Sequence, residues 1–171
     1  MATSPVNRNN MFYSEQDFQM ETDIWVNYIE EDLNQTIVLY AVDHSQTTVN
    51  SIYNTTTSTD VRFKTPKELP CMYEIKEPET KSYDATTQNA VYQIGGNLEI
   101  IMPTKVLEKY DADITRGDYI GILVDDDRMV YYVVTNDGKV NTNNAAMLGG
   151  YRPAARKIEG TMVTDTEFNG A

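Results

Sequence analysis

The sequence of 171 residues contains few of the side chains on which catalysis and metal binding commonly depend. Its one cysteine, Cys71, cannot form a disulfide within the chain, and we expect a buried, unreactive thiol in a reducing compartment. His44 is the one histidine, and Asp43 and Ser45 flank it in a trio with the residue types of a hydrolytic triad. Neighbours in sequence rarely converge on one substrate atom, so we interpret His44 as a solvated loop residue. We therefore predict a protein that is not an enzyme and that uses no cofactor and no metal.

Long apolar runs are also missing from the sequence. No stretch approaches the roughly 18 apolar residues that a membrane-spanning helix needs. Residues 1–10 are mostly polar and lack the apolar segment of a secretory signal. These two absences predict a soluble protein that is made in a cytoplasm and does not enter a membrane.

Basic residues are scarce, with 14 lysines and arginines against 26 aspartates and glutamates and a net charge of −12. Proteins that hold nucleic acid through its phosphates need the opposite sign. Arg152, Arg156 and Lys157 form the notable basic cluster, which suits either an acidic neighbour in an assembly or an ordinary solvated strand start. Asp125, Asp126 and Asp127 lack the ligand spacing of a calcium loop, so a polar hairpin turn is the favoured interpretation.

Tyrosine dominates the aromatic residues, with 12 copies against one tryptophan and four phenylalanines. A large apolar ring with one hydrogen-bonding tip suits subunit interfaces, and it suits strands equally well. The residues that we select as interface candidates are Tyr13, Phe18, Trp25, Tyr53, Tyr131, Arg152 and Arg156.

Residues 1–34 are predicted to form a polar arm followed by a helix. Ser14 and Asp17 have the spacing of a capping box, and Phe18, Trp25 and Leu33 follow at helical intervals. This pattern predicts a helix over 15–33 with acidic residues on its other face. Residues 23–29 also alternate well enough for a strand.

Residues 35–165 are predicted to form a mainly β core, a small β-barrel or sandwich with long polar loops, and 166–171 a short tail. The apolar continuity of 119–124 and 129–134 indicates a hairpin covered on both faces. The core covers one face, and a helix, a loop or another subunit covers the other. A short helix is expected over 104–110. The expected strands are 36–42, 61–64, 69–76, 90–94, 98–102, 119–124, 129–134 and 156–164, and the expected loops 43–60, 77–88 and 141–153.

The second half of the chain resembles the head-closure and neck proteins of tailed bacteriophages. The matching pattern is Leu98-Glu99-Ile100-Ile101, Leu107, Ile114, Gly117-Asp118-Tyr119-Ile120 and Tyr131-Tyr132-Val133-Val134. In that group a similar strand precedes a Gly-Asp turn, a hairpin and a final strand. The likeness extends loosely over 36–165, and the N-terminal helix departs from it, which leaves the position in the connector open.

The resemblance implies a structural virion protein that forms a homo-oligomeric ring, with six- or twelvefold symmetry, in the connector between head and tail. Its partners would be the portal protein and adjacent connector or tail proteins, and DNA would pass through the channel without specific binding. Asp125, Asp126 and Asp127 would then lie near the lumen or a loop tip. The alternatives are another virion component, such as a capsid decoration or tail protein, and a β-barrel module that binds a carbohydrate or small ligand. Tyr131 and Tyr132 would be candidates for such a ligand site.

Overall fold

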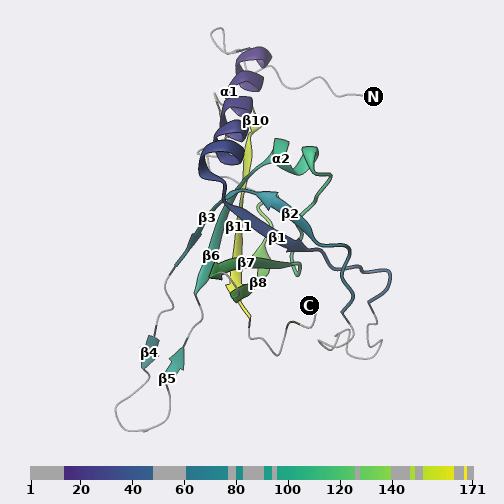
Figure 1. The fold of residues 1–171 in the computed structure, drawn as a ribbon, viewed down its shortest axis with the longest axis vertical. Coiled ribbons are helices and arrows are strands. Elements are labelled where there is room, and N and C mark those ends of the chain that lie inside the picture. Colours follow the sequence, from purple (N-terminus) through teal and green to yellow (C-terminus); the bar gives the residue numbers. More distant parts are fainter. Residues whose placement is uncertain are drawn as a thin grey trace.

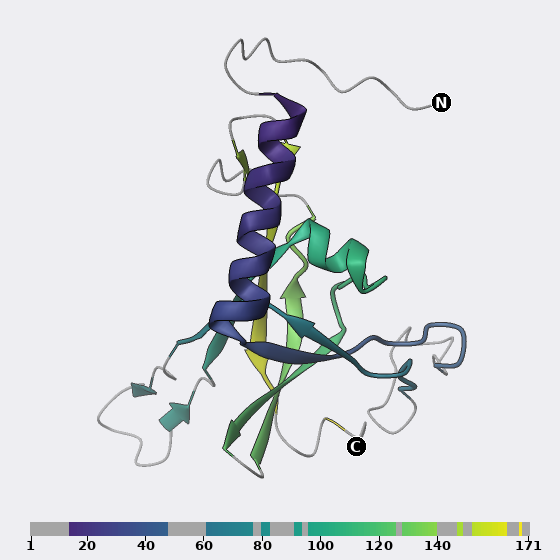
Figure 2. The same cartoon turned by 45° about the horizontal axis from the view of Figure 1, so that its top comes forward.

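A computed structural model, drawn in two orientations in Figures 1 and 2, describes the greater part of the chain. The described residues are 14–47, 61–76, 80–82, 91–93, 96–125, 128–139, 147–148, 152–163 and 168. The predicted mainly β fold with an N-terminal helix is confirmed, because a helix precedes a seven-stranded antiparallel sheet. Most of the predicted loop residues lie outside the described part, but 80–82, 147–148 and 152–153 were predicted as loop and instead form short strands, because each pairs with a neighbouring segment.

The N-terminal helix α1 (Glu15–Asn27) continues into a π-helical segment, η1 (Tyr28–Leu33), so the prediction of a helix over 15–33 is confirmed. The backbone N–H of Ser14 donates to the Asp17 carboxylate at 2.8 Å, and the Asp17 N–H donates to Ser14 Oγ at 3.3 Å. This reciprocal pair satisfies two N–H groups that a helix start otherwise leaves without partners. Asn34 ends the segment with a left-handed φ of 49°.

One face of α1 and η1 is anchored in the protein interior. Phe18, Thr22, Val26 and Ile29 are buried at spacings of four, four and three residues, which places them on one side of the helix. The Thr22 hydroxyl donates to the Phe18 carbonyl at 2.8 Å, so the polar group in this face has a partner. Val26 belongs to the main hydrophobic core, and the helix is therefore part of the same packed unit as the sheet.

The sheet uses strands from the whole length of the described chain. Its order is β2 (Lys67–Pro70), β1 (Thr36–Tyr40), β7 (Tyr119–Asp125), β8 (Arg128–Asn136), β11 (Ala155–Met162), β6 (Asn97–Pro103) and β3 (Met72–Ile75). Every neighbouring pair is antiparallel. The short predicted helix is present as α2 (Thr104–Lys109), and the remaining strands form two small pairs, β4 (Thr80–Ser82) with β5 (Val91–Gln93) and β9 (Met147–Leu148) with β10 (Arg152–Pro153).

The sheet is curled but is not closed into a barrel, and it is one sheet rather than the two of a sandwich. Its edge strands β2 and β3 do not pair with each other, yet Cys71 alone separates them in the chain. Chain continuity therefore brings the two edges together at Cys71. The Cys71 N–H donates to the Gln35 carbonyl at 2.9 Å, which fixes this corner against the end of the helix.

The core fills the inner face of the curled sheet. Directly opposed strand residues share a face, so Leu39 and Ile120 point inward together, as do Ile158 and Ile100. Val106 and Leu107 of α2 are buried against the same core. Each of these side chains is at most 4% exposed, so the apolar periodicity of the strands identified the inner face correctly.

A buried carboxylate joins the start of β7 to the end of β1. Asp118 accepts hydrogen bonds from the Val42 N–H at 2.9 Å, from the Thr115 N–H at 2.7 Å and from the Thr115 hydroxyl at 2.8 Å. Gly117, before it, has a φ of +90°, which other residues rarely adopt. The local structure thus explains the Gly117-Asp118 pair as a turn that a buried acceptor holds.

Aromatic side chains cover part of the outer face of the sheet. Tyr40, Tyr119 and Tyr131 point outward from three adjacent strands, and the Phe63 and Phe168 rings lie against them. Residues 61–64 were predicted as a strand, but in the structure of this segment Phe63 makes only an isolated antiparallel bridge to Val42. The sequence did not indicate what covers the outer face of the β7–β8 hairpin. Here other segments of the same chain cover part of it.

Candidate interaction surfaces

The end of the sheet that lies opposite α2 exposes large apolar side chains. Because neighbouring strands are antiparallel, alternate strands of the sheet point in the same direction. Strands β3, β7 and β11 therefore have their C-terminal ends at the same end of the sheet. Figure 2 shows the β7–β8 hairpin pointing away from both helices at this end. We define the distal end by its four apolar residues, which are 40–57% exposed: Ile75, Leu123, Val124 and Met162.

The strand register places the distal residues on both faces of the sheet. Met162 is opposite Tyr132 and therefore faces inward, whereas Leu123 is opposite Met129 and faces outward. The register shifts between Leu123 and Asp125, which indicates a β-bulge that re-aims the chain just before the turn. Both sides of this end can thus contact another molecule through apolar groups.

The three acidic residues of the predicted loop tip come directly after Val124 in the sequence. Asp125 is the last residue of β7, and Asp126 and Asp127 lie outside the described residues. The hairpin predicted from the sequence is confirmed, since residues 119–125 pair with 128–133. The proposed location of these carboxylates near a lumen stays a prediction.

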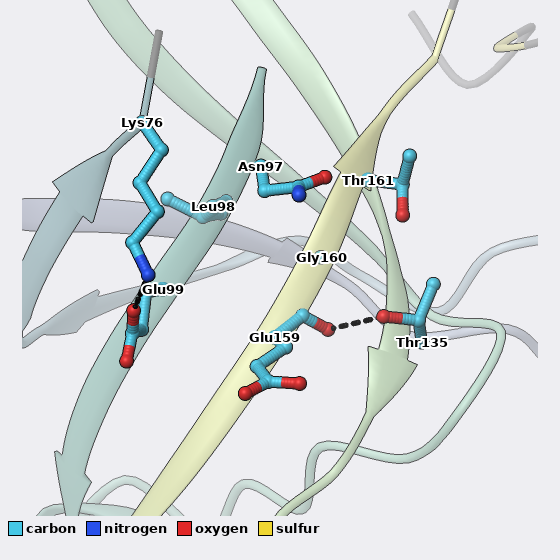
Figure 3. Close-up of a pocket in the computed structure, with 8 residues that line it drawn as sticks. All are labelled: Lys76, Asn97, Leu98, Glu99, Thr135, Glu159, Gly160 and Thr161. Atoms are coloured by element: carbon cyan, nitrogen blue, oxygen red, sulfur yellow. Dashed lines mark hydrogen bonds and ion pairs between the residues drawn. The ribbon is translucent and has the colours of Figure 1, made fainter. Parts of the chain in front are cut away.

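The outer face beyond the aromatic cluster carries a small polar groove of about 280 Å³ on β6, β8 and β11. Figure 3 shows Lys76 reaching across to Glu99 from one side of this groove. The Nζ of Lys76 lies 2.5 Å from Glu99, and Lys157 contacts the other carboxylate oxygen. Hydrogen bonds from Lys157 and then Lys76 lower the pKa of Glu99 below its usual value. The groove is therefore occupied by its own ion pairs, which favours a structural role over ligand capture.

The basic cluster that the sequence singled out also has partners within the chain. Arg156 and Lys139 contact the two Asp113 oxygens at 2.9 and 2.8 Å. Partial burial raises the pKa of Asp113, but the hydrogen bonds from Lys139 and Arg156 outweigh it and lower the pKa. Lys157 pairs with Glu99, and the Arg152 side chain lies outside the described residues. Arg156 and Lys157 therefore have acidic neighbours without a second molecule.

The other predicted interface residues are not brought together. Phe18 is 4% exposed and belongs to the interior, so it is not available as a surface contact. Trp25 is half-buried on α1, and Tyr131 is half-buried in the aromatic cluster, where the Phe168 ring stacks on it at 4.0 Å. Tyr13 and Tyr53 lie outside the described residues. The distal-end residues were not among the predicted interface residues, although the uninterrupted apolar run over 119–124 was a signal that could have found Leu123 and Val124.

The described residues offer little catalytic chemistry. Asp43 accepts hydrogen bonds from the Ser45 N–H and hydroxyl at 2.9 and 2.6 Å, so the trio around His44 forms a local turn. Cys71 is fully buried, and burial raises the pKa of its thiol to about 12. Within the described ranges no three histidine, cysteine or acidic side chains are placed to share a metal ion. No helix in that part of the chain is long and apolar enough to span a membrane.

Comparison with known proteins identified no family for this chain. No model of a known protein family matches the sequence, and no curated protein matches it significantly.

Proposed function

We propose that the protein is a non-enzymatic structural subunit of a ring in the head-to-tail connector of a tailed bacteriophage. In this proposal the ring joins the portal to the tail and lines the channel through which DNA leaves. The protein would be assembled in the host cytoplasm and would remain in the virion. The resemblance of residues 98–134 to neck proteins suggests this class, and the exposed distal end is the structural observation that carries it.

The distal end supports assembly because it exposes large apolar side chains from several strands at one end of the sheet. Ile75, Leu123, Val124 and Met162 come from three strands and are all substantially exposed at one end of the sheet. Contiguous exposed apolar surface commonly marks a protein interface. A ring needs a heterologous contact, in which one surface of a subunit meets a different surface of the next. An apolar end on one side of the molecule supplies one half of such a contact.

The charge distribution supports passage of DNA without tight binding. The net charge is −12, and the described lysines and arginines near the polar groove and Asp113 are engaged by carboxylates. Each phosphate held by a cation would strengthen binding and slow transit. A lumen near the Asp125–Asp127 turn would instead repel the DNA backbone.

The proposal is tested with the full-length protein, alone and with the portal protein of the same phage. Light scattering should give the mass of a six- or twelvefold assembly, and negative-stain microscopy should show rings. The double substitution Leu123→Ser and Met162→Ser should abolish these rings while the monomer stays folded. Tyr110→Ser is the control, because Tyr110 at the end of α2 is 37% exposed and lies outside the distal end.

Two outcomes would contradict the proposal. One is a wild-type protein that stays monomeric with and without the portal at every concentration tested. The other is ring formation that survives loss of Leu123 and Met162, because the distal end would then have no part in assembly.

A further inference from the structure

Helix α1 has a second apolar face, on the side that points away from the core. Met20, Ile24 and Tyr28 are spaced by four residues and form one row along the helix, with exposures of 45–60%. The row extends over about 12 Å, at about 1.5 Å per residue. The sequence predicted acidic residues on this face of the helix, and in the structure the same face also exposes this row of apolar side chains. We call this row the α1 ridge.

The α1 ridge is set in a helix that carries acidic charge only. Residues 15–33 contain no lysine or arginine, and their seven acidic residues are Glu15, Asp17, Glu21, Asp23, Glu30, Glu31 and Asp32. Asp23 and Glu30 face α2, where Lys105 and Lys109 pair with them. Asp17, Glu21 and Glu31 each lie three residues from a ridge residue, so they flank the ridge on the exposed side.

We infer that the α1 ridge binds a basic amphipathic helix belonging to a different protein. A ridge of residues spaced by four is the element that helices use to pack against one another. An amphipathic helix laid along it would cover the three apolar side chains, and its lysines or arginines would lie beside the flanking carboxylates. A second copy of this chain is disfavoured, because α1 against α1 would bring fourteen acidic side chains together and no basic one.

This inference goes beyond the proposed function and does not require ring formation. The α1 ridge and the distal end lie on different elements, so a substitution in one leaves the other intact. A connector subunit would use the distal end for its own copies and the α1 ridge for a neighbour of another kind. The α1 ridge would be expected to bind the same helix even if this protein formed no rings.

The test uses full-length protein and two synthetic helical peptides about 20 residues long. Both carry leucines at four-residue spacing; one is flanked by lysines and the other by glutamates, and neither contains tryptophan. Binding is followed through the fluorescence of Trp25, which is half-buried on the same helix. The wild-type protein should bind the lysine peptide, more weakly as salt rises, and should not bind the glutamate peptide.

Two substitutions then locate the binding site. Ile24→Gln should weaken binding of the lysine peptide by about tenfold or more, because it removes the centre of the ridge. Leu123→Gln, on a similarly exposed residue, should bind as the wild type does. The two variants should keep the wild-type circular dichroism spectrum and thermal midpoint, because both side chains are exposed.

Equal binding of the lysine peptide to both variants would overturn the inference, since attraction would then come from net charge alone. Equal binding of the two peptides would overturn it as well. So would sedimentation data in which the protein alone self-associates and Ile24→Gln abolishes that association, because a second copy would then be the occupant. Loss of rings in the Leu123 variant, with peptide binding retained, would separate this inference from the proposed function.

Discussion

Replacing Phe168 by alanine should destabilise the protein strongly, although the residue lies near the C-terminal end of the sequence. Phe168 is 6% exposed and stacks on Tyr131 with 4.0 Å between ring centroids. Its centroid also lies 5.0 Å from the Tyr40 ring and 5.4 Å from those of Phe63 and Tyr119. Phe168 is thus the centre of the aromatic cluster, and its loss would uncover the outer face of β1, β7 and β8.

The expected loss in the free energy of unfolding is about 3 kcal/mol. Substitution of a buried phenylalanine by alanine typically costs about 3–5 kcal/mol, because transfer energy is lost and a cavity remains. The lower end applies here, since the rings of Phe63, Tyr119 and Tyr131 are partly exposed and can close over the gap. Phe168→Leu keeps most of the apolar volume and loses the aromatic contacts, so we expect a loss of about 1 kcal/mol.

Urea unfolding, followed by the fluorescence of the one tryptophan, measures both variants with the same probe. The midpoint should move to lower urea while the slope stays constant, which would indicate that the unfolded state has not changed. A double-mutant cycle with Tyr131→Leu isolates the stacking contribution, which we expect to be about 1 kcal/mol. A loss below about 0.5 kcal/mol for Phe168→Ala would refute the packing that we describe.

Three further predictions concern single groups. Asp118→Ala leaves the Val42 and Thr115 N–H groups without their acceptor and should cost about 3 kcal/mol in urea unfolding, while Asp118→Asn, which keeps one oxygen, should cost less. Ser14→Ala removes the helix cap and should cost about 1 kcal/mol, with Ser14→Asp as a control that keeps it; equal losses would contradict the capping role. Hydrogen bonds from Lys157 and Lys76 lower the pKa of Glu99 in the folded state. The ionised Glu99 carboxylate therefore stabilises the fold above its unfolded pKa, and this stabilisation is lost as pH falls through the folded pKa. Glu99→Gln should be less stable than the wild type near neutrality, and the difference in the free energy of unfolding should shrink in acid.

Local sequence signals determined the elements of this fold. The Ser14–Asp17 capping box and the apolar spacing after it predicted the helix, and the structure confirms it over 15–33. Uninterrupted apolar runs on either side of a polar turn predicted the β7–β8 hairpin. Each of these features depends on residues that are close together in the chain, so periodicity and turn chemistry suffice to find them.

Long-range contacts decided the features that the sequence analysis could not foresee. The curl of the sheet follows from β2 and β3 taking opposite edges on either side of Cys71, which depends on how β1 and β6 are placed. The aromatic cluster unites Phe63 with Phe168, more than one hundred residues apart, and so covers a face that the sequence left open. The sequence alone predicted the N-terminal helix and the β7–β8 hairpin, because those preferences are local, but it did not predict the short strands β4, β9 and β10 or the break at Cys71 between β2 and β3. Only the tertiary structure decided which apolar groups stay exposed at the distal end and on the α1 ridge, because exposure depends on what else packs against them.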